Sequence, residues 1–394
     1  MTDEFEILSK KLEQRNVNVE QTIKKLENFK IGTPSWGYSE GGTRFHVFQD
    51  PYAARDVIER LDDAAQVNKY TGIAPEVAIH IPWDKAESYN EIADYSQDLG
   101  MKITAVNPNL FEEEEYKYGS LCNSKPEIRK KALEHVMECL DICKILRAPY
   151  LSLWFPDGTN FPGQGDFVKR KKWMLESLKE VYAAMPDFVI MLLEYKFFEP
   201  AFYHTDIPDW GQAYLLCKKL GERAKVLVDL GHHPHGTNIE FIVANLVDEG
   251  FLGGFHMNSR KYADDDLTTG SLNLYELFLI FWELIKGNAD DSRKTGFMLD
   301  QSHNLKSKIE AMIQSVLTAQ EVYAKSLTID RSRLENAQEN QNIINAETCL
   351  KDAFFTDVNP ILVRFREGKG LPQDPLKAFL DSGYKAQILK KRRL

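Results

Sequence analysis

Eight short stretches rich in apolar and β-branched residues recur along the chain, and helical patterns separate them. The stretches cover residues 30–37, 76–83, 101–109, 149–157, 187–196, 224–233, 252–260 and 295–303. Between them, apolar residues repeat at helical spacing over residues 51–68, 86–99, 126–147, 168–184, 239–249, 273–287 and 304–327. The strand stretches are continuous apolar runs, as expected for strands covered on both faces. Eight strands alternating with helices predict an α/β fold, a (β/α)8 TIM barrel over residues 29–328.

The segments around this barrel are expected to be helical. An open doubly wound sheet is the alternative arrangement, but no glycine-rich phosphate loop follows the first strand. The first helix of the barrel is expected to begin with Asp50 as N-cap and Pro51 at its first position. Residues 1–28 are predicted to form an N-terminal helix. Residues 329–394 are predicted to form a helical extension that makes the protein a homo-oligomer.

The charge and the cysteines limit the classes of partner. The net charge of −10 argues against the basic surface of a nucleic-acid binder, and residues 390–393 are expected to be a solvated basic tail. No apolar run reaches membrane-spanning length, and no secretory signal is visible. The five cysteines lack framework spacing, and Cys139 and Cys143 are expected to be buried thiols. The sequence therefore predicts a cytoplasmic protein without membrane or nucleic-acid partners.

Chemically reactive residues gather where the predicted strands end, and this is where TIM barrels build their active sites. Singly, each residue would more often have a structural role. In chain order they are His80, Trp83, Asp84, Trp154, Asp157, Glu194, Lys196, Asp229, His232, His256, Asp264, Asp265, Asp266, Asp300 and Ser302. Their joint occurrence predicts one site at the mouth of the barrel.

Five carboxylates would converge on this mouth, from Glu194, Asp229, Asp264, Asp266 and Asp300. Uncompensated, they would repel one another and take up protons, and one lysine cannot neutralise them. Divalent cations can, and carboxylates with one or two imidazoles suit Mn²⁺, Mg²⁺ or Co²⁺. The sequence therefore predicts a metal centre.

Seven ligand candidates exceed one coordination shell, so we expect two metal ions per subunit. The first site would comprise Glu194, Asp229, His256 and Asp300. The second would comprise His232, Asp264 and Asp266, with Glu194 or Asp229 as a bridge. Asp265, which points the other way, would be the exposed member of its trio.

Several reactions are compatible with such a centre. Trp83, Trp154 and Phe155 offer flat apolar walls, and Lys196 can polarise a carbonyl oxygen, which favours sugar chemistry. Phosphodiester hydrolysis remains an alternative, although it would call for more histidine ligands and a basic rim. An epimerase acting on ketoses and a sugar-binding protein without turnover also remain open.

The motifs Glu194-x-Lys196, Asp229-x-x-His232, Asp264-x-Asp266 and Asp300 resemble those of the xylose isomerase-like superfamily of metal-dependent aldose–ketose isomerases. The segments "VDLGHHPHGTN", "HMNSRKYADDDL" and "LDQSHN" resemble its L-rhamnose isomerase branch. His256 stands where xylose-specific members would carry a carboxylate, and Asp229 where they would carry a glutamate. The resemblance implies a homotetramer with two divalent ions, Mn²⁺ before Co²⁺, Mg²⁺ or Zn²⁺.

The implied reaction converts L-rhamnose reversibly to L-rhamnulose, by ring opening and a metal-assisted hydride shift between C2 and C1. An enediol route with a carboxylate base is the alternative. The resemblance assigns the first ligand set above to a structural metal and the second to a catalytic metal. The catalytic residues implied are Lys196, which would bind O1, His80, which would meet the ring oxygen, Asp300 and His232. Asp84 would orient His80.

The substrate-binding residues implied are Trp83, Trp154, Ser302 and Phe45. Phe45 and Phe48 both lie on a glycine-rich loop after the first strand, and one of them would complete the pocket of a neighbouring subunit. Packing of this loop on its own barrel is the alternative.

Overall fold

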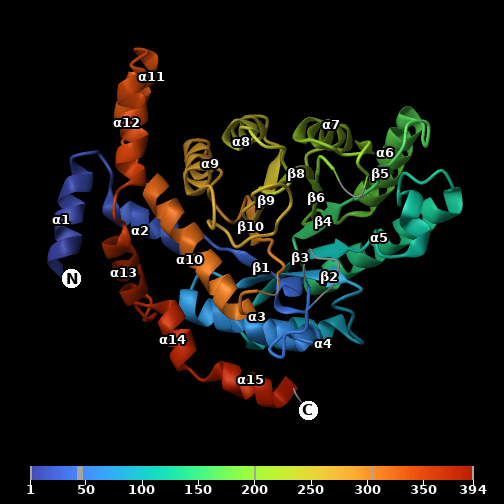
Figure 1. The fold of residues 1–394 in the computed structure, drawn as a ribbon, viewed down its shortest axis with the longest axis horizontal. Helices are drawn as coiled ribbons and strands as arrows, with labels where there is room; N and C mark the ends of the chain where they lie inside the picture. Colours follow the sequence, from blue (N-terminus) through green and yellow to red (C-terminus); the bar gives the residue numbers. More distant parts are fainter. Residues whose placement is uncertain (1, 42–47, 199–200, 304, 393–394) are drawn as a thin grey trace.

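The computed structural model describes residues 2–41, 48–198, 201–303 and 305–392 (Figure 1). Eight parallel strands close into a barrel in the order β1-β10-β9-β8-β6-β4-β3-β2. Their bounds are β1 (Gly32–Pro34), β2 (Glu76–Ile81), β3 (Lys102–Pro108), β4 (Tyr150–Trp154), β6 (Ile190–Glu194), β8 (Ala224–Asp229), β9 (Leu252–Met257) and β10 (Gly296–Leu299). Each lies within a predicted strand stretch. The predicted (β/α)8 barrel is confirmed.

A helix follows each strand of the barrel along the chain, and these helices form the outer ring in Figure 1. They are α3 (Val57–Thr71), α4 (Tyr89–Asp98), α5 (Pro126–Leu146), α6 (Phe167–Ala184), α7 (Trp210–Leu220), α8 (Ile239–Asp248), α9 (Leu274–Lys286) and α10 (Lys308–Ser326). Helix α7 was not predicted. Two further short strands, β5 (Gly158–Thr159) and β7 (His204–Thr205), pair antiparallel and tie the loops after β4 and β6 together.

The start of α3 differs from the prediction. The helix begins at Val57, and the side chain of Asp56 caps it by accepting a hydrogen bond from the Glu59 N–H at 2.9 Å. The Asp50 side chain instead accepts from the Tyr52 N–H at 2.9 Å, inside a separate turn. Turns favour the same Asp–Pro chemistry as helix starts, so the local pattern was ambiguous.

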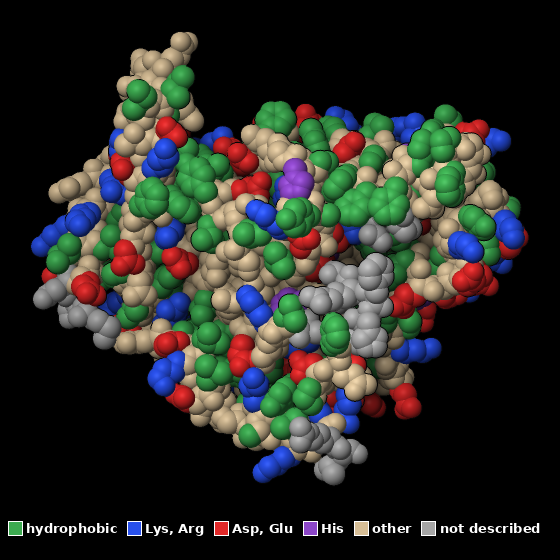
Figure 2. All heavy atoms as spheres, viewed as in Figure 1, with side chains coloured by type: hydrophobic (Ala, Val, Ile, Leu, Met, Phe, Trp, Pro, Cys, Tyr) green, Lys and Arg blue, Asp and Glu red, His purple; other side chains and the backbone are tan. Residues whose placement is uncertain are grey.

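Helices from both ends of the chain pack against one side of the barrel. The predicted N-terminal helix is in fact two, α1 (Thr2–Glu13) and α2 (Val19–Asn28). The C-terminal segment forms α11 (Arg331–Glu339), α12 (Ile343–Phe354), α13 (Asn359–Gly368), α14 (Pro375–Asp381) and α15 (Tyr384–Arg392). Helix α13 contacts α1 and α2, and α14 contacts α3 and α10. Helices α11 and α12 form a hairpin that projects from the body in Figures 1 and 2.

The prediction of a solvated basic tail is wrong for Arg392. Its guanidinium is buried and donates to the two carboxylate oxygens of Asp63 at 2.9 and 3.0 Å. It also lies 3.2 Å from Glu59, which like Asp63 belongs to α3. Burial raises the pKa of Asp63 to about 6, although Arg392 lowers it. Helix α15 is therefore anchored on α3, while Lys390 and Lys391 are exposed.

Apolar side chains fill the inside of the barrel below its mouth. These inward-facing residues are Ala78, Ala105, Tyr150, Leu192, Leu227 and Met298. A larger core lies between the strands and the helices, and all five cysteines are buried, as expected for Cys139 and Cys143. Among the described residues, no helix combines the length and the apolar character needed to cross a membrane.

Candidate active site

A cavity of about 1090 Å³ opens at the C-terminal ends of the strands. Most of the predicted site residues line it: His80, Trp83, Trp154, Glu194, Lys196, His232, His256, Asp264, Asp266, Asp300 and Ser302. Asp229 is fully buried and lies beside His256 and His232. Phe45 lies outside the described residues. The face shown in Figure 2 carries acidic and basic side chains intermixed, without a continuous basic surface among the residues described.

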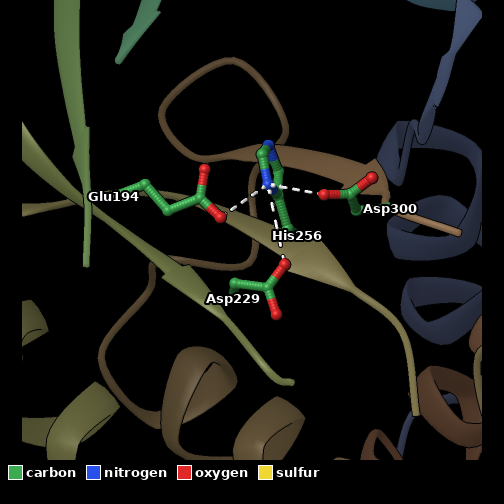
Figure 3. Close-up of side chains that lie close together, drawn as sticks. All are labelled: Glu194, Asp229, His256 and Asp300. Atoms are coloured by element: carbon green, nitrogen blue, oxygen red, sulfur yellow. Dashed lines mark hydrogen bonds and ion pairs between the residues drawn. The ribbon is translucent and has the colours of Figure 1, made fainter. Parts of the chain in front are cut away.

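Glu194, Asp229, His256 and Asp300 form a compact cluster (Figure 3). The His256 Nδ1 lies 3.2 Å from Glu194 Oε1, 3.4 Å from Asp300 Oδ2 and 3.7 Å from Asp229 Oδ2. The four ligand atoms all lie within 4.8 Å of one another. A divalent cation bound at about 2.0–2.6 Å holds its ligands within roughly this spacing. The cluster therefore fits a single divalent ion.

A second group comprises Asp229, His232 and Asp264. The His232 Nε2 lies 3.4 Å from Asp264 Oδ2, and its Nδ1 lies 3.1 Å from the carbonyl oxygen of Tyr195. A carbonyl can only accept, so Nδ1 carries a proton, and Nε2 is the nitrogen that would bind a cation after releasing its own proton. Metal-binding histidines commonly have such a backbone partner on their other nitrogen. Asp229 belongs to both groups and is placed to bridge them.

The three consecutive aspartates have different surroundings. Asp264 Oδ2 accepts from Lys196 Nζ at 2.7 Å. Asp266 lines the cavity but lies outside the compact second group, and its backbone φ of 46° places it in the left-handed region. Asp265 accepts from the backbone N–H groups of Lys261 and Tyr262, and so shapes the loop.

The pKa values of these groups show why positive charge is needed here. Burial raises the pKa of Asp229 to about 7, although His232 lowers it. Burial and the neighbouring Asp264 raise the pKa of Asp266 well above its usual value. Burial lowers the pKa of His232 and His256, but the carboxylates around them outweigh it and raise both pKa values well above the usual range. Bound divalent ions would supply this charge without requiring protons.

Aromatic rings line the other side of the cavity. The rings of His80 and Trp83 stack with centroids 4.0 Å apart, and Trp36 meets His80 edge-on at 5.7 Å. Phe111 lies 5.1 Å from Trp154 and 5.7 Å from His80, which makes the wall continuous. The Lys196 ammonium lies 5.2 Å from the centre of the Trp154 ring. The cavity thus has a charged side and an aromatic side.

The expectation that Asp84 orients the His80 ring is wrong. Its carboxylate accepts from the backbone N–H of His80 at 2.8 Å and pairs with Arg60 at 2.6 Å. The ring is held by aromatic stacking, and its Nδ1 is buried without a hydrogen-bond partner among the described residues. Burial lowers the pKa of His80 to about 3. The imidazole is therefore neutral.

Asp157 is separated from this site although it follows β4. It does not line the cavity and instead accepts from the backbone N–H and the hydroxyl of Ser120, at 2.8 and 2.9 Å. Cys122 donates to the same carboxylate, and Asp206 and Arg170 contact this thiol in turn. Asp157 is thus part of the loop packing.

The structure adds cavity residues that the sequence reasoning missed. The Trp36 Nε1 donates to Asp300 Oδ1 at 3.0 Å, and the Trp83 Nε1 donates to Glu112 at 3.0 Å. Trp36 lies at the end of the first predicted strand stretch. The expectation that site residues lie at strand ends therefore applies to it as well. Glu112 and Phe111 lie in a loop beyond β3 and carried no such signal. Asn107 and Ser152 also line the cavity.

Comparison with known proteins identifies the family. The model of the xylose isomerase-like TIM barrel family matches residues 61–283. A probable sugar isomerase of Rhizobium meliloti is 40% identical over 401 residues, covering 100% of this chain and 93% of that protein. The xylose isomerase of Thermus thermophilus is 26% identical over 60% of this chain and 65% of its own.

A solved structure shows the same fold. An L-ribulose 3-epimerase superposes with a TM-score of 0.54 at 12% identity, covering 82% of this chain and 97% of that one. With most of the chain matched by the family model and by a full-length relative, the protein belongs to the xylose isomerase-like TIM barrel family.

Proposed function

We propose that the protein is a metal-dependent aldose–ketose isomerase, and that its preferred reaction is the conversion of L-rhamnose to L-rhamnulose. One observation carries this proposal. Two groups of ligand atoms share Asp229 at the mouth of the barrel, with Lys196 beside them and an aromatic wall opposite. Family membership and the 40% identical probable sugar isomerase support the reaction class.

Two divalent cations per subunit are proposed, Mn²⁺ before Co²⁺, Mg²⁺ or Zn²⁺, because carboxylate oxygens dominate the donor set. The first ion would be held by Glu194, Asp229, His256 and Asp300. The second would be held by His232, Asp264 and Asp266, with Asp229 shared. Such ions supply Lewis acidity and a template for two adjacent sugar oxygens.

The chain's own residues would bind the sugar and move protons. Lys196 would donate a hydrogen bond to O1 of the open-chain aldehyde, and its position between Asp264 and the Trp154 ring supports this role. His80 is neutral, so it can accept and return a proton at the ring oxygen during ring opening. In the net reaction, the C2 hydrogen moves to C1 with its electron pair. O2 loses a proton and O1 gains one.

The aromatic wall favours a sugar with an apolar end. Trp36, Trp83, Phe111 and Trp154 line the cavity, and two of these rings adjoin the charged residues, Trp36 at Asp300 and Trp154 at Lys196. L-rhamnose carries a methyl group at C6, where mannose has a hydroxyl and xylose has no carbon. Burying this methyl group against aromatic carbon is favourable, whereas burying an unpaired hydroxyl there is costly.

A ketose epimerase is less well supported. It would use a pair of carboxylates on opposite faces of the sugar, and β4 should supply one of them. Asp157 is the acidic residue nearest the end of β4, and it is held by Ser120 away from the cavity.

We further infer that the protein forms a homo-oligomer, a tetramer, through its C-terminal segment. The tip of the projecting hairpin carries Ile343 and Ile344, which are 78% and 80% exposed. Two adjacent apolar side chains at the tip of a projecting hairpin support a contact with another copy of the chain there.

The test is a metal-stripped protein reloaded with one cation at a time. Each form is incubated with L-rhamnose, L-lyxose, L-mannose, D-allose and D-xylose, and the ketose formed is measured by chromatography. We expect no turnover without metal, restoration by Mn²⁺ or Co²⁺, and the highest kcat/KM with L-rhamnose. Full activity in metal-free protein would contradict the proposed centre.

A matched pair of variants tests the second ligand set. Asp266→Asn should lower kcat by about a hundredfold or more with a smaller effect on sugar binding. Asp265→Asn, which alters the neighbouring carboxylate outside the cavity, should retain activity. Equal turnover in the two variants would remove Asp266 from the proposed site.

A further inference from the structure

The inside of the barrel consists of two layers of side chains with different chemistry. The lower layer is the apolar set at Ala78, Ala105, Tyr150, Leu192, Leu227 and Met298. Side chains along a strand alternate between faces, so the residue two positions later points inward again. Those residues are His80, Asn107, Ser152, Glu194, Asp229 and Asp300. Directly above the apolar floor, the barrel therefore has a second layer that is polar.

The strand order divides this polar layer into two halves. The proposed metal ligands come from neighbouring strands and loops on the β6, β8, β9 and β10 side. In a closed ring of eight strands, β3 lies across from β9, and β4 lies across from β10. Asn107 on β3 therefore faces the β9 side of the metal cluster across the barrel, and Ser152 on β4 faces the β10 side while it borders β6, which carries Glu194.

The amide of Asn107 is held in one orientation. It is 8% exposed, and its Nδ2 donates to the carbonyl oxygen of Ile79 on the adjacent strand at 3.0 Å. Because that carbonyl can only accept, the group facing it must be the NH2, and the amide oxygen is turned the other way. No hydrogen bond to this oxygen is recorded among the described residues. The residue lines the cavity.

Ser152 presents a hydroxyl that lacks a partner. The residue is 2% exposed and lines the cavity, and its Oγ is buried without a hydrogen bond among the residues described. Buried hydroxyls are nearly always hydrogen-bonded in native proteins. A buried hydroxyl without a partner at a cavity wall therefore points to a bound group that forms a hydrogen bond with it. A ligand in the cavity could supply this partner.

The two side chains are neighbours. Ala105 pairs with Tyr150 and Val106 with Leu151 in the parallel register, so Asn107 and Ser152 are the next pair along the same two strands. Adjacent strands lie about 4.8 Å apart. A hydroxyl oxygen between them can donate to the Asn107 oxygen and accept from the Ser152 hydroxyl at once.

We propose that Asn107 and Ser152 together recognise one hydroxyl of the sugar beyond the two reacting carbons, and so set substrate specificity. The pair would fix how far the sugar extends from the charged wall. The aromatic residues above them would cover its apolar faces. The inference rests on the proposed function, because it requires a polyhydroxylated substrate whose O1 and O2 lie at the opposite wall.

Equilibrium binding tests the pair without relying on turnover. The ligands are L-rhamnitol, the open-chain polyol that cannot isomerise, and three derivatives that lack the hydroxyl at C3, C4 or C5. Calorimetry on the metal-loaded protein should show one derivative binding the wild type about ten- to a hundredfold more weakly than L-rhamnitol. That derivative identifies the recognised hydroxyl.

The variants Ser152→Ala and Asn107→Leu should each weaken L-rhamnitol binding by a similar factor. Both should bind the identified derivative as the wild type does, because the hydroxyl they would recognise is already absent. Ser177→Ala, a buried serine on α6 outside the cavity, is the control. Asn107→Ala, which removes the amide without adding bulk or charge, should show the same loss and gives a second test if the leucine variant fails to fold.

The outcomes separate the two proposals. If the wild type binds none of the polyols, the proposed function fails and this inference fails with it. If the wild type discriminates among the derivatives but the variants behave like it, only the Asn107–Ser152 inference is overturned. A loss that is equal for all four ligands also overturns it, because general damage would then explain the effect.

Discussion

At the scale of single residues, the direction in which a side chain points decides what it does. Asp264 and Asp265 are neighbours of the same type, yet one meets Lys196 and the other accepts loop N–H groups. Alternation along the chain makes such a difference predictable from sequence. The free nitrogen of His232 was not predictable, because it is set by the carbonyl of Tyr195, a backbone atom on another strand end.

The two cluster histidines imply that metal binding depends on pH. The pKa values of His232 and His256 are raised in the metal-free protein, so protons occupy the imidazoles that a cation needs. Binding must release these protons, and the affinity for Mn²⁺ should therefore weaken as pH falls through the raised pKa values of the two imidazoles. Calorimetry in buffers of different ionisation enthalpy should detect up to about two protons released per chain. Affinity and heat that do not change with pH or buffer would contradict this account.

At the scale of elements, the sequence predicted which strands and helices form better than it predicted where they begin and end. All eight strands were found because buried parallel strands are continuous apolar runs. Helix α7 was not predicted because Gly211 lies in its first turn and weakens the local helical pattern. Asn107 and Ser152 line the cavity but carry no charge, so the convergence of carboxylates at the strand ends gave no signal for them. Counting two residues upward from the apolar layer would have found both.

The true start of α3 can be tested against the predicted one. Asp56→Ala removes the side chain that caps the helix and should lower the free energy of unfolding by about 1 kcal/mol. Asp50→Ala removes only a turn contact and should change it by less than about 0.5 kcal/mol. Urea unfolding of the two variants measures both values. A larger loss for Asp50→Ala would reverse the assignment.

At the scale of the whole molecule, contacts between distant parts of the chain join the C-terminal helices to the barrel. Arg392 meets Asp63 across 329 residues, and Tyr384 donates to the same carboxylate at 2.9 Å. Local sequence patterns cannot reveal such a pair, since the run "KKRR" looks like any solvated tail. The burial of Arg392 depends on where α3 lies after the barrel has closed.

Removing Arg392 should therefore destabilise the protein markedly. Arg392→Ala leaves Asp63 buried without its cation and removes one of the two cations beside Glu59, which keeps Arg55, and we expect a loss of about 3–5 kcal/mol in the free energy of unfolding. Lys391→Ala removes an exposed partner of Asp62 and should cost less than about 1 kcal/mol. The double variant Arg392→Ala with Asp63→Ala should lose less than the sum of the single losses. Strict additivity would show that the pair is not coupled.

The burial of all five cysteines has a consequence for how the molecule can be observed. Burial raises the pKa of each thiol, so the thiolate that reacts with an alkylating reagent is scarce in the folded state. The thiols are distributed over α5, α7, α12 and the loop before α5. Each cysteine is thus a natural probe of local opening. Its alkylation rate reports how often its own region opens to solvent, so the barrel wall and the C-terminal hairpin can be followed separately.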